Sequence, residues 1–329
     1  MCARRSPTPM PPENLLDKTA AADDPGEPVA DITTCYRHPR RETYVRCARC
    51  DRPVCPDCMK EAAVGFHCPE CLREGSRTVR QARTVFGGRV VTNTFATYAL
   101  IALNVVAYLV ELVYPSVVDR FDSLGIALLG PDGQYYVADG GAYPGFEPVG
   151  IAYGEWDRLI TSAFLHLQPT DGGFGILHIL LNMYWLWVLG RILEERLGHA
   201  RLVAVYLVSA LGGSVLGFLI SPDQGAVGAS GAIFGLAACY FVITRRLHEH
   251  PIDRNRLIVM FVLWLVLSAG FTSWEGHLGG LLAGGAVAVG LAYAPQHRRV
   301  AAHVATTTAM TVLLLGLVVL KSLQLTGSI

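Results

Sequence analysis

Seven apolar stretches occupy most of the chain after residue 93 and restrict its fold more than any other feature. They approach the ~20 residues that a helix needs to cross a bilayer, and several are shorter. Backbone polar groups inside a bilayer must be bonded within the segment, so such stretches predict helices. The sequence therefore predicts an all-α polytopic membrane protein with seven spans. The stretches are residues 94–114, 176–190, 202–220, 230–244, 257–272, 277–294 and 305–320.

Charge separates a soluble front segment from this apolar part. Residues 1–92 carry 27 of the 54 charged residues, and the longer segment 93–329 carries the other 27. The net charge is zero, which argues against binding nucleic acid through bulk charge. Residues 1–34 are rich in Pro, Asp, Ala and Thr and lack the apolar run of a signal peptide, so we expect a disordered tail there.

Seven of the nine cysteines lie between Cys35 and Cys71, in pairs separated by two residues. That spacing turns both side chains toward one tetrahedral ion, and Zn²⁺ prefers four sulfur or nitrogen ligands. Four pairs give eight ligands, enough for two closed structural zinc sites. A disulfide framework is the alternative, and the odd number of cysteines argues against it. The pairs are Cys35/His38, Cys47/Cys50, Cys55/Cys58 and Cys68/Cys71.

Arginine placement predicts the orientation of the spans. Alternate connections are rich in arginine, and the connections between them hold almost none. The positive-inside rule then places the N-terminus in the cytoplasm and the C-terminus outside. Only 3 of the 27 basic residues are lysine, which points to a GC-rich bacterial genome and hence to the plasma membrane. The arginine-rich connections are residues 72–92, 191–201, 245–256 and 295–304; the basic linker 73–93 can contact anionic lipid.

Spans two, four and six all start on the outer side with a chemically reactive residue. Their parallel direction predicts that Ser230 and His277 lie at similar depth. His277 can serve as the base that activates the Ser230 hydroxyl, and we expect a dyad because no carboxylate lies deep in spans two to six. His178, Asn182 four residues later, and the Ser230 N–H can form an oxyanion hole.

These motifs resemble the rhomboid family of intramembrane serine proteases. The segments that carry the resemblance are Gly228-Ala229-Ser230-Gly231, His277-Leu278-Gly279-Gly280, His178-Ile179-Leu180-Leu181-Asn182, the Gly190/Glu194/Gly198 pattern and the Trp156/Arg158 pair. The resemblance implies a six-helix protease domain over 94–294, with residues 295–329 adding a loop and a seventh helix. It implies cleavage of transmembrane proteins within or near their spans. It also implies that Gly228 and Phe234 line the substrate site and that Glu194 is structural.

Residues 35–72 resemble a B-box-type zinc domain. In that family the pairs alternate, so Cys35/His38 would join Cys55/Cys58, and Cys47/Cys50 would join Cys68/Cys71. His67 is an alternative ligand to Cys68. The resemblance implies two structural zinc ions, none for catalysis, and docking of a cytosolic protein partner.

Rival functions remain open from the sequence. An inactive rhomboid-like protein that binds client helices would not need Ser230. A metalloprotease would need His-Glu-x-x-His, and His248-Glu249-His250 does not have that spacing.

Overall fold

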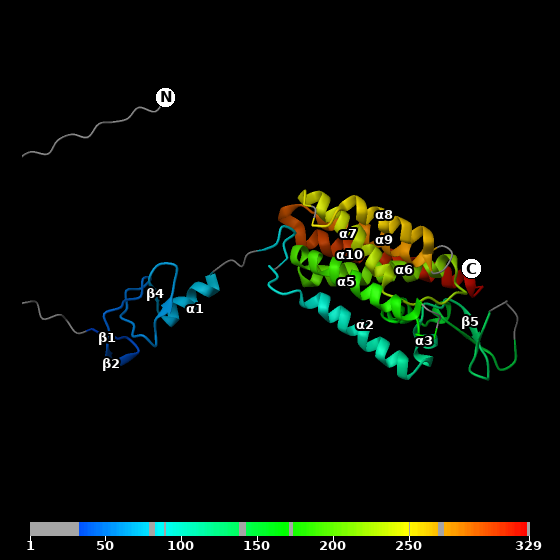
Figure 1. The fold of residues 1–329 in the computed structure, drawn as a ribbon, viewed down its shortest axis with the longest axis horizontal. Helices are drawn as coiled ribbons and strands as arrows, with labels where there is room; N and C mark the ends of the chain where they lie inside the picture. Colours follow the sequence, from blue (N-terminus) through cyan, green and yellow to red (C-terminus); the bar gives the residue numbers. More distant parts are fainter. Residues whose placement is uncertain are drawn as a thin grey trace, which may run out of the picture. The chain divides into compact units, whose positions relative to one another are not determined.

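The computed structural model describes residues 33–78, 83–88, 90–137, 143–170, 174–249, 251–268 and 273–327. The chain forms two compact units, within residues 1–80 and 81–329. Most of the predicted disordered tail, residues 1–32, lies outside the described residues. Figure 1 colours both units by sequence.

The first unit is small and has almost no apolar core. Six cysteines and Val54 are its fully buried apolar side chains among the described residues. Two short antiparallel hairpins and one helix are its regular elements, and most of these buried residues lie in the turns and loops between them. Ligand groups therefore occupy the positions that a larger domain would fill with aliphatic side chains. The elements are β1 (Thr34–Cys35) paired with β2 (His38–Glu42), β3 (Lys60–Glu61) paired with β4 (Phe66–His67), and α1 (Pro69–Thr78).

The second unit is a helical bundle. Six of its described helical segments are long and apolar enough to cross a membrane, and α8 is a shorter seventh helix of 15 residues. Each predicted apolar stretch therefore coincides with a helix, although residues 269–272 of the fifth stretch lie outside the described part. The helices, most of which run alongside one another in Figure 1, are α2 (Phe95–Val113), α5 (Gly175–Leu197), α6 (His199–Ile220), α7 (Ser230–Leu247), α8 (Arg254–Ser268), α9 (Trp274–Ala292) and α10 (Arg299–Leu325), the last preceded by η4 (Gln296–Arg298).

Helix α5 begins one residue before its predicted apolar stretch, and α9 begins three residues before its own. Helix α5 begins at Gly175, so His178 lies at the end of its first turn rather than at its first residue. Helix α9 begins at Trp274, and the Ser273 hydroxyl caps it by accepting the Gly276 N–H at 3.3 Å. Cap and first-turn residues lie outside the apolar run, so hydropathy alone cannot locate them.

Helices α6, α7 and α9 pack most closely, because glycines remove the side chains between their backbones. A Cβ atom on Gly280 of α9 would collide with the Gly231 carbonyl of α7. One on Gly279 would collide with the Gly212 carbonyl of α6. Small residues of this kind let membrane helices approach to backbone contact. We call the Gly231–Gly280 contact the glycine seam.

Glu194 is fully buried at the end of α5 and caps the start of α2. Its carboxylate accepts the backbone N–H groups of Ala96 at 2.7 Å and Thr97 at 2.8 Å. These are unpaired donors at a helix N-terminus, where the dipole also favours negative charge. Gly190, one turn earlier, leaves room for the Thr97 side chain. The contacts agree with the structural role expected for Glu194.

The loop that joins α2 to α5, residues 114–174, contains elements that the sequence analysis did not anticipate. A small antiparallel sheet has the strand order β6-β5-β7. Short helical turns connect the sheet to the bundle, and the loop returns to α5 through them. The elements are α3 (Ser116–Phe121), β5 (Ala127–Leu129), β6 (Tyr135–Tyr136), β7 (Glu147–Val149), η1 (Ile151–Tyr153), α4 (Arg158–Thr161) and η2 (Ser162–Phe164).

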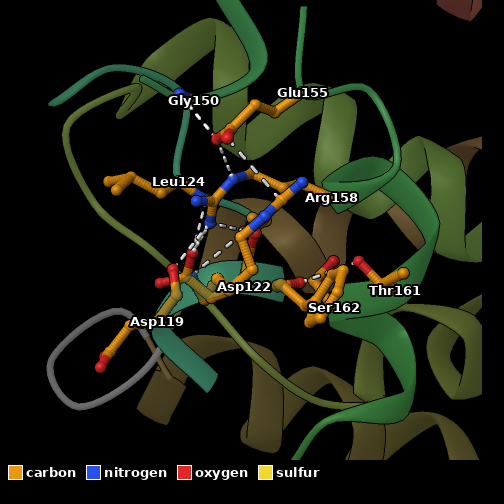
Figure 2. Close-up of polar contacts among 12 residues, drawn as sticks. Asp119, Asp122, Leu124, Gly150, Glu155, Arg158, Thr161 and Ser162 are labelled. Carbon is orange, nitrogen blue, oxygen red and sulfur yellow. Dashed lines mark hydrogen bonds and ion pairs between the residues drawn. The ribbon is translucent and has the colours of Figure 1, made fainter. Parts of the chain in front are cut away.

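Arg158 lies in the middle of a group of polar contacts in this α2–α5 loop, as Figure 2 shows. Its side chain is fully buried and forms ion pairs with Asp122 at 2.7 Å and Glu155 at 2.6 Å. The same guanidinium donates to the Asp119 carbonyl, and Glu155 in turn accepts the Gly150 N–H at 2.9 Å. One buried cation thus joins segments that are almost 40 residues apart.

Replacing Arg158 by methionine is expected to destabilise the α2–α5 loop by about 3 kcal/mol, since two partly buried carboxylates lose their cation. Thermal unfolding in detergent and limited proteolysis of the loop would measure the effect. Arg120→Met is the matched control, because Arg120 pairs with Glu155 and Asp157 on an exposed surface and should contribute at most about 1 kcal/mol. Equal effects of the two substitutions would contradict a central role for Arg158.

Candidate active site and metal clusters

Ser230 and His277 are brought together by the packing of α7 against α9. The Ser230 Oγ and His277 Nε2 atoms lie 2.9 Å apart, a hydrogen-bond distance. Ser230 is the first residue of α7, where backbone N–H groups have no partner within the helix. His277 is buried in the first turn of α9. The glycine seam lies next to this pair and sets the separation of the two helices.

The imidazole of His277 is fixed by an aromatic neighbour rather than by a carboxylate. Phe234, one turn after Ser230, stacks on it with ring centroids 4.5 Å apart and an angle of 14° between the planes. Within the described residues, His277 Nδ1 is buried without a hydrogen-bond partner. Glu275, the acidic residue nearest in sequence, accepts instead from the Ser221 hydroxyl at 2.8 Å. The geometry is that of a serine–histidine pair.

His178 faces the same place from α5. Its Nδ1 atom accepts the Leu167 backbone N–H at 3.2 Å, so the ring proton resides on Nε2, which is free to donate. A Cβ atom placed on Gly228 would lie 2.9 Å from this Nε2 and 3.6 Å from the Ser230 Oγ. His178 Nε2 therefore points into the space beside the serine hydroxyl.

Gly228 and Asn182 complete the surroundings of the serine. Gly228 has φ +132°, which side-chain-bearing residues rarely adopt, and the Ser162 carbonyl accepts its N–H at 2.9 Å. Asn182 is buried one turn after His178 and donates one amide proton to the His178 carbonyl at 2.8 Å. Its second amide proton is available to another acceptor.

A cavity of about 970 Å³ opens around these residues. All six predicted site residues on the bundle line it, together with aromatic side chains of α5 and α8. Its size and its mixture of apolar walls with a few polar groups are typical of a binding site. The six residues are His178, Asn182, Gly228, Ser230, Phe234 and His277.

Glu111 is a buried residue of α2 that the sequence analysis did not use. Its carboxylate accepts the His166 N–H at 3.0 Å, and its backbone carbonyl accepts from the Gln168 side chain at 3.2 Å. Both contacts hold the segment whose middle residue, Leu167, donates to His178. A carboxylate inside an apolar span is itself a signal of function, and could have marked Glu111.

The first unit brings the eight predicted metal ligands into two clusters. Within each cluster the ligand atoms all lie within 4.8 Å of one another. One set holds Cys35, His38, Cys55 and Cys58, and the other holds Cys47, Cys50, Cys68 and Cys71. This is the alternating pairing, and Cys68 rather than His67 is in the cluster. Both clusters could hold a metal ion.

The donor chemistry of the clusters suits zinc. Backbone N–H groups point at the sulfur atoms, for example Cys68 N to Cys47 Sγ at 3.2 Å. Burial acts to raise the pKa of the Cys47 thiol, but N–H groups of Cys68, Arg49 and Cys50 outweigh burial and lower that pKa to about 6. A thiolate is the form that binds metal, and sets of four sulfur or three sulfur and one nitrogen donors are those of structural zinc sites.

The fold and the cavity define a polytopic membrane protein with a serine–histidine pair, and comparison with known proteins names its class. Residues 153–294 match the Rhomboid domain. The Bacillus subtilis protein YdcA is 35% identical over 141 residues, which cover 41% of this chain and 67% of YdcA. The chain belongs to the rhomboid family.

Two further relatives are proteases by name. Rhomboid protease GluP of Bacillus subtilis is 36% identical over 147 residues, 43% of this chain and 27% of GluP. Rhomboid protease GlpG of Salmonella choleraesuis is 35% identical over 156 residues, 45% of this chain and 51% of GlpG. The chain thus spans about a quarter of GluP and half of GlpG. The match to the Rhomboid domain, residues 153–294, does not include the cysteine clusters.

Proposed function

We propose that the chain is an intramembrane serine protease that cleaves transmembrane proteins within or near their spans. The 2.9 Å contact between Ser230 Oγ and His277 Nε2 carries the proposal, because a serine hydroxyl becomes a nucleophile only beside a base. Membership of the rhomboid family and relatives named as rhomboid proteases support it. The cavity offers space for an unwound substrate segment and for water.

In the proposed reaction, Ser230 Oγ attacks the scissile carbonyl carbon while His277 Nε2 takes the hydroxyl proton. The resulting imidazolium gives that proton to the leaving amine as the peptide C–N bond breaks. Water then attacks the acyl-enzyme, loses a proton to His277, and releases the carboxylic acid, with the proton returned to Ser230. Phe234 holds the imidazole plane through these transfers.

The negative charge on the carbonyl oxygen needs donors that are already in place. We assign this role to three donors near Ser230: the His178 Nε2–H, the second amide proton of Asn182 and the Ser230 backbone N–H. The Leu167 N–H keeps His178 in the donating tautomer. Gly228 leaves the room that this oxygen would occupy, since a Cβ there would meet His178.

The same proposal includes a location. The serine and both histidines lie at the N-terminal turns of α5, α7 and α9. Arginines lie in the last turns of α5 and α7, and Arg298 and Arg299 follow the end of α9 by a few residues. Positive-inside placement puts the catalytic end outside a bacterial plasma membrane and the N-terminus in the cytoplasm. Residues 35–72 then form a cytosolic module with two structural zinc ions and a protein-docking role.

Cleavage of a fluorescent single-span substrate by the purified full chain in liposomes tests the proposed function. The wild type should cleave, and Ser230→Ala should not. Cleavage that survives in Ser230→Ala would overturn the dyad. A folded wild type that binds client helices without cleaving any substrate of a diverse panel would favour the inactive, client-binding alternative.

Glu111 is expected to act as a positioning residue for His178. Glu111→Ala removes the acceptor that holds the His166–Gln168 segment and should lower kcat about tenfold with little change in KM, since one buried hydrogen bond is lost. Glu111→Gln keeps an acceptor oxygen and should restore kcat. Steady-state cleavage of the liposome substrate measures both constants.

Asn104→Ala is the matched control for Glu111. Asn104 is buried on the same helix but bonds to the Leu100 carbonyl and the Tyr206 hydroxyl, away from His178. Its replacement should reduce stability and leave kcat unchanged. Equal losses of kcat in Glu111→Ala and Glu111→Gln would contradict the positioning role.

A further inference from the structure

A second cavity, of about 580 Å³, lies at the end of the bundle opposite the serine. Its lining comes from the end of α7, the start of α8 and the residue that follows α9. Every side chain in the lining is basic or a phenol. The lining residues are Arg245, Arg246, His248, Arg254 and Tyr293.

The charge of this basic pocket is not compensated. Among the residues that the structure describes, no carboxylate forms an ion pair with Arg245, Arg246 or Arg254. The carboxylate of Glu249, which follows closely in sequence, instead pairs with Arg196 of α5 at 2.7 Å. Three guanidinium groups around one hollow repel one another unless an anion lies between them.

Two features hold the pocket side chains in place. The Arg246 guanidinium lies over the Tyr293 ring, 5.7 Å from its centroid, a cation–π arrangement. His248 ends α7 with φ 58°, a left-handed conformation that usually falls to glycine. A residue with a side chain at this position costs backbone energy, and here its imidazole becomes part of the pocket wall.

The position of the pocket along the length of α7 indicates which anion it can bind. Arg245 lies 15 residues after Ser230 on one continuous helix, about 22 Å along the axis. Helix α7 as a whole, at 18 residues, is about 27 Å long, close to the thickness of the hydrocarbon core. The pocket therefore lies at headgroup level of the leaflet opposite the active site, where phospholipid phosphates are concentrated.

We propose that this pocket binds a phosphate group, supplied by the headgroup of an anionic phospholipid. Guanidinium groups match phosphate oxygens with paired N–H donors, and basic pockets between membrane helices are suited to lipid headgroups. Free phosphate has the same recognition chemistry, and the experiment separates the two sources. The binding site is independent of the catalytic residues.

The test titrates the full chain in a non-ionic detergent with dihexanoyl phosphatidylglycerol, dihexanoyl phosphatidylcholine and sodium phosphate. Saturable binding of phosphatidylglycerol is expected. The double variant Arg246→Gln/Arg254→Gln should weaken that binding about thirtyfold, the effect of two basic residues at a membrane surface. The matched control is Arg256→Gln/Arg298→Gln, which removes two exposed arginines outside the pocket and should leave the affinity unchanged.

Each outcome decides the proposal. Weakened phosphatidylglycerol binding in the pocket variant alone supports a headgroup site. If sodium phosphate binds as tightly and competes, the site takes free phosphate and the lipid source is overturned. Equal losses in the pocket and control variants, or no saturable binding of any probe to the wild type, overturn the site. Because the replaced side chains are at the surface, helical circular dichroism should be the same for all variants.

Discussion

Replacing His277 by alanine is expected to slow cleavage of a single-span substrate by about 10⁴-fold. Without the imidazole at 2.9 Å, the Ser230 hydroxyl keeps its proton and the leaving amine has no acid to protonate it. In the proposed mechanism the two residues act as one unit, so the double variant Ser230→Ala/His277→Ala should be no slower than either single variant. Initial rates in liposomes, at equal amounts of folded protein, measure this.

His297→Ala is the matched control for His277. His297 lies exposed in the short turn η4, away from the cavity, so its loss should leave the rate unchanged. Labelling by a fluorophosphonate gives a second measurement, since it needs an activated serine but no substrate helix. Labelling of Ser230 in His277→Ala at the wild-type rate would contradict the assignment of His277 as the base.

Removing zinc is expected to unfold residues 35–72 and leave the bundle intact. The unit has little apolar core besides its cysteines, so metal binding would provide its folding energy, about 10–16 kcal/mol for a structural zinc site. Metal analysis by mass spectrometry should find two zinc ions per wild-type chain and one in His38→Ala. Limited proteolysis after chelation should cut within this unit and spare the helices from α2 onward.

His67→Ala is the control for His38→Ala. His67 precedes Cys68 but is in neither cluster, so its loss should release no zinc. If His67→Ala releases as much zinc as His38→Ala, the ligand assignment is wrong. If a chelated chain still resists proteolysis between residues 35 and 72, the unit does not depend on metal for its fold.

Much of the fold was predictable because few backbone structures can cross a bilayer with all their polar groups bonded. In the described part of the chain, each apolar stretch contains a helix, yet α5 continues through Arg191–Leu197, which hydropathy assigns to a connection. Hydropathy indicates which part of a helix can lie in the apolar core of the bilayer. It does not indicate the residue at which the backbone hydrogen bonds of the helix end. The β5–β7 sheet was missed because its strands are only two or three residues long and carry no periodic pattern.

The candidate site was predictable as a set of residues but not as a geometry. Parallel spans place Ser230 and His277 at one depth, whereas their contact depends on how closely α7 and α9 pack. The tautomer of His178 depends on the Leu167 N–H, and the position of that group depends on the path of the α2–α5 loop. Contacts between segments so far apart in sequence leave no local pattern. The catalytic roles stay predictions until they are measured.

The glycine seam has a consequence for heat inactivation. Because Gly231 and Gly280 set the spacing of α7 and α9 backbone to backbone, the Ser230 Oγ and His277 Nε2 atoms are held by the most tightly packed part of the bundle. Loops can loosen on warming without moving these atoms apart. We therefore expect the protein to keep its reactive pair up to the temperature at which the bundle itself melts, and to lose it in the same cooperative step.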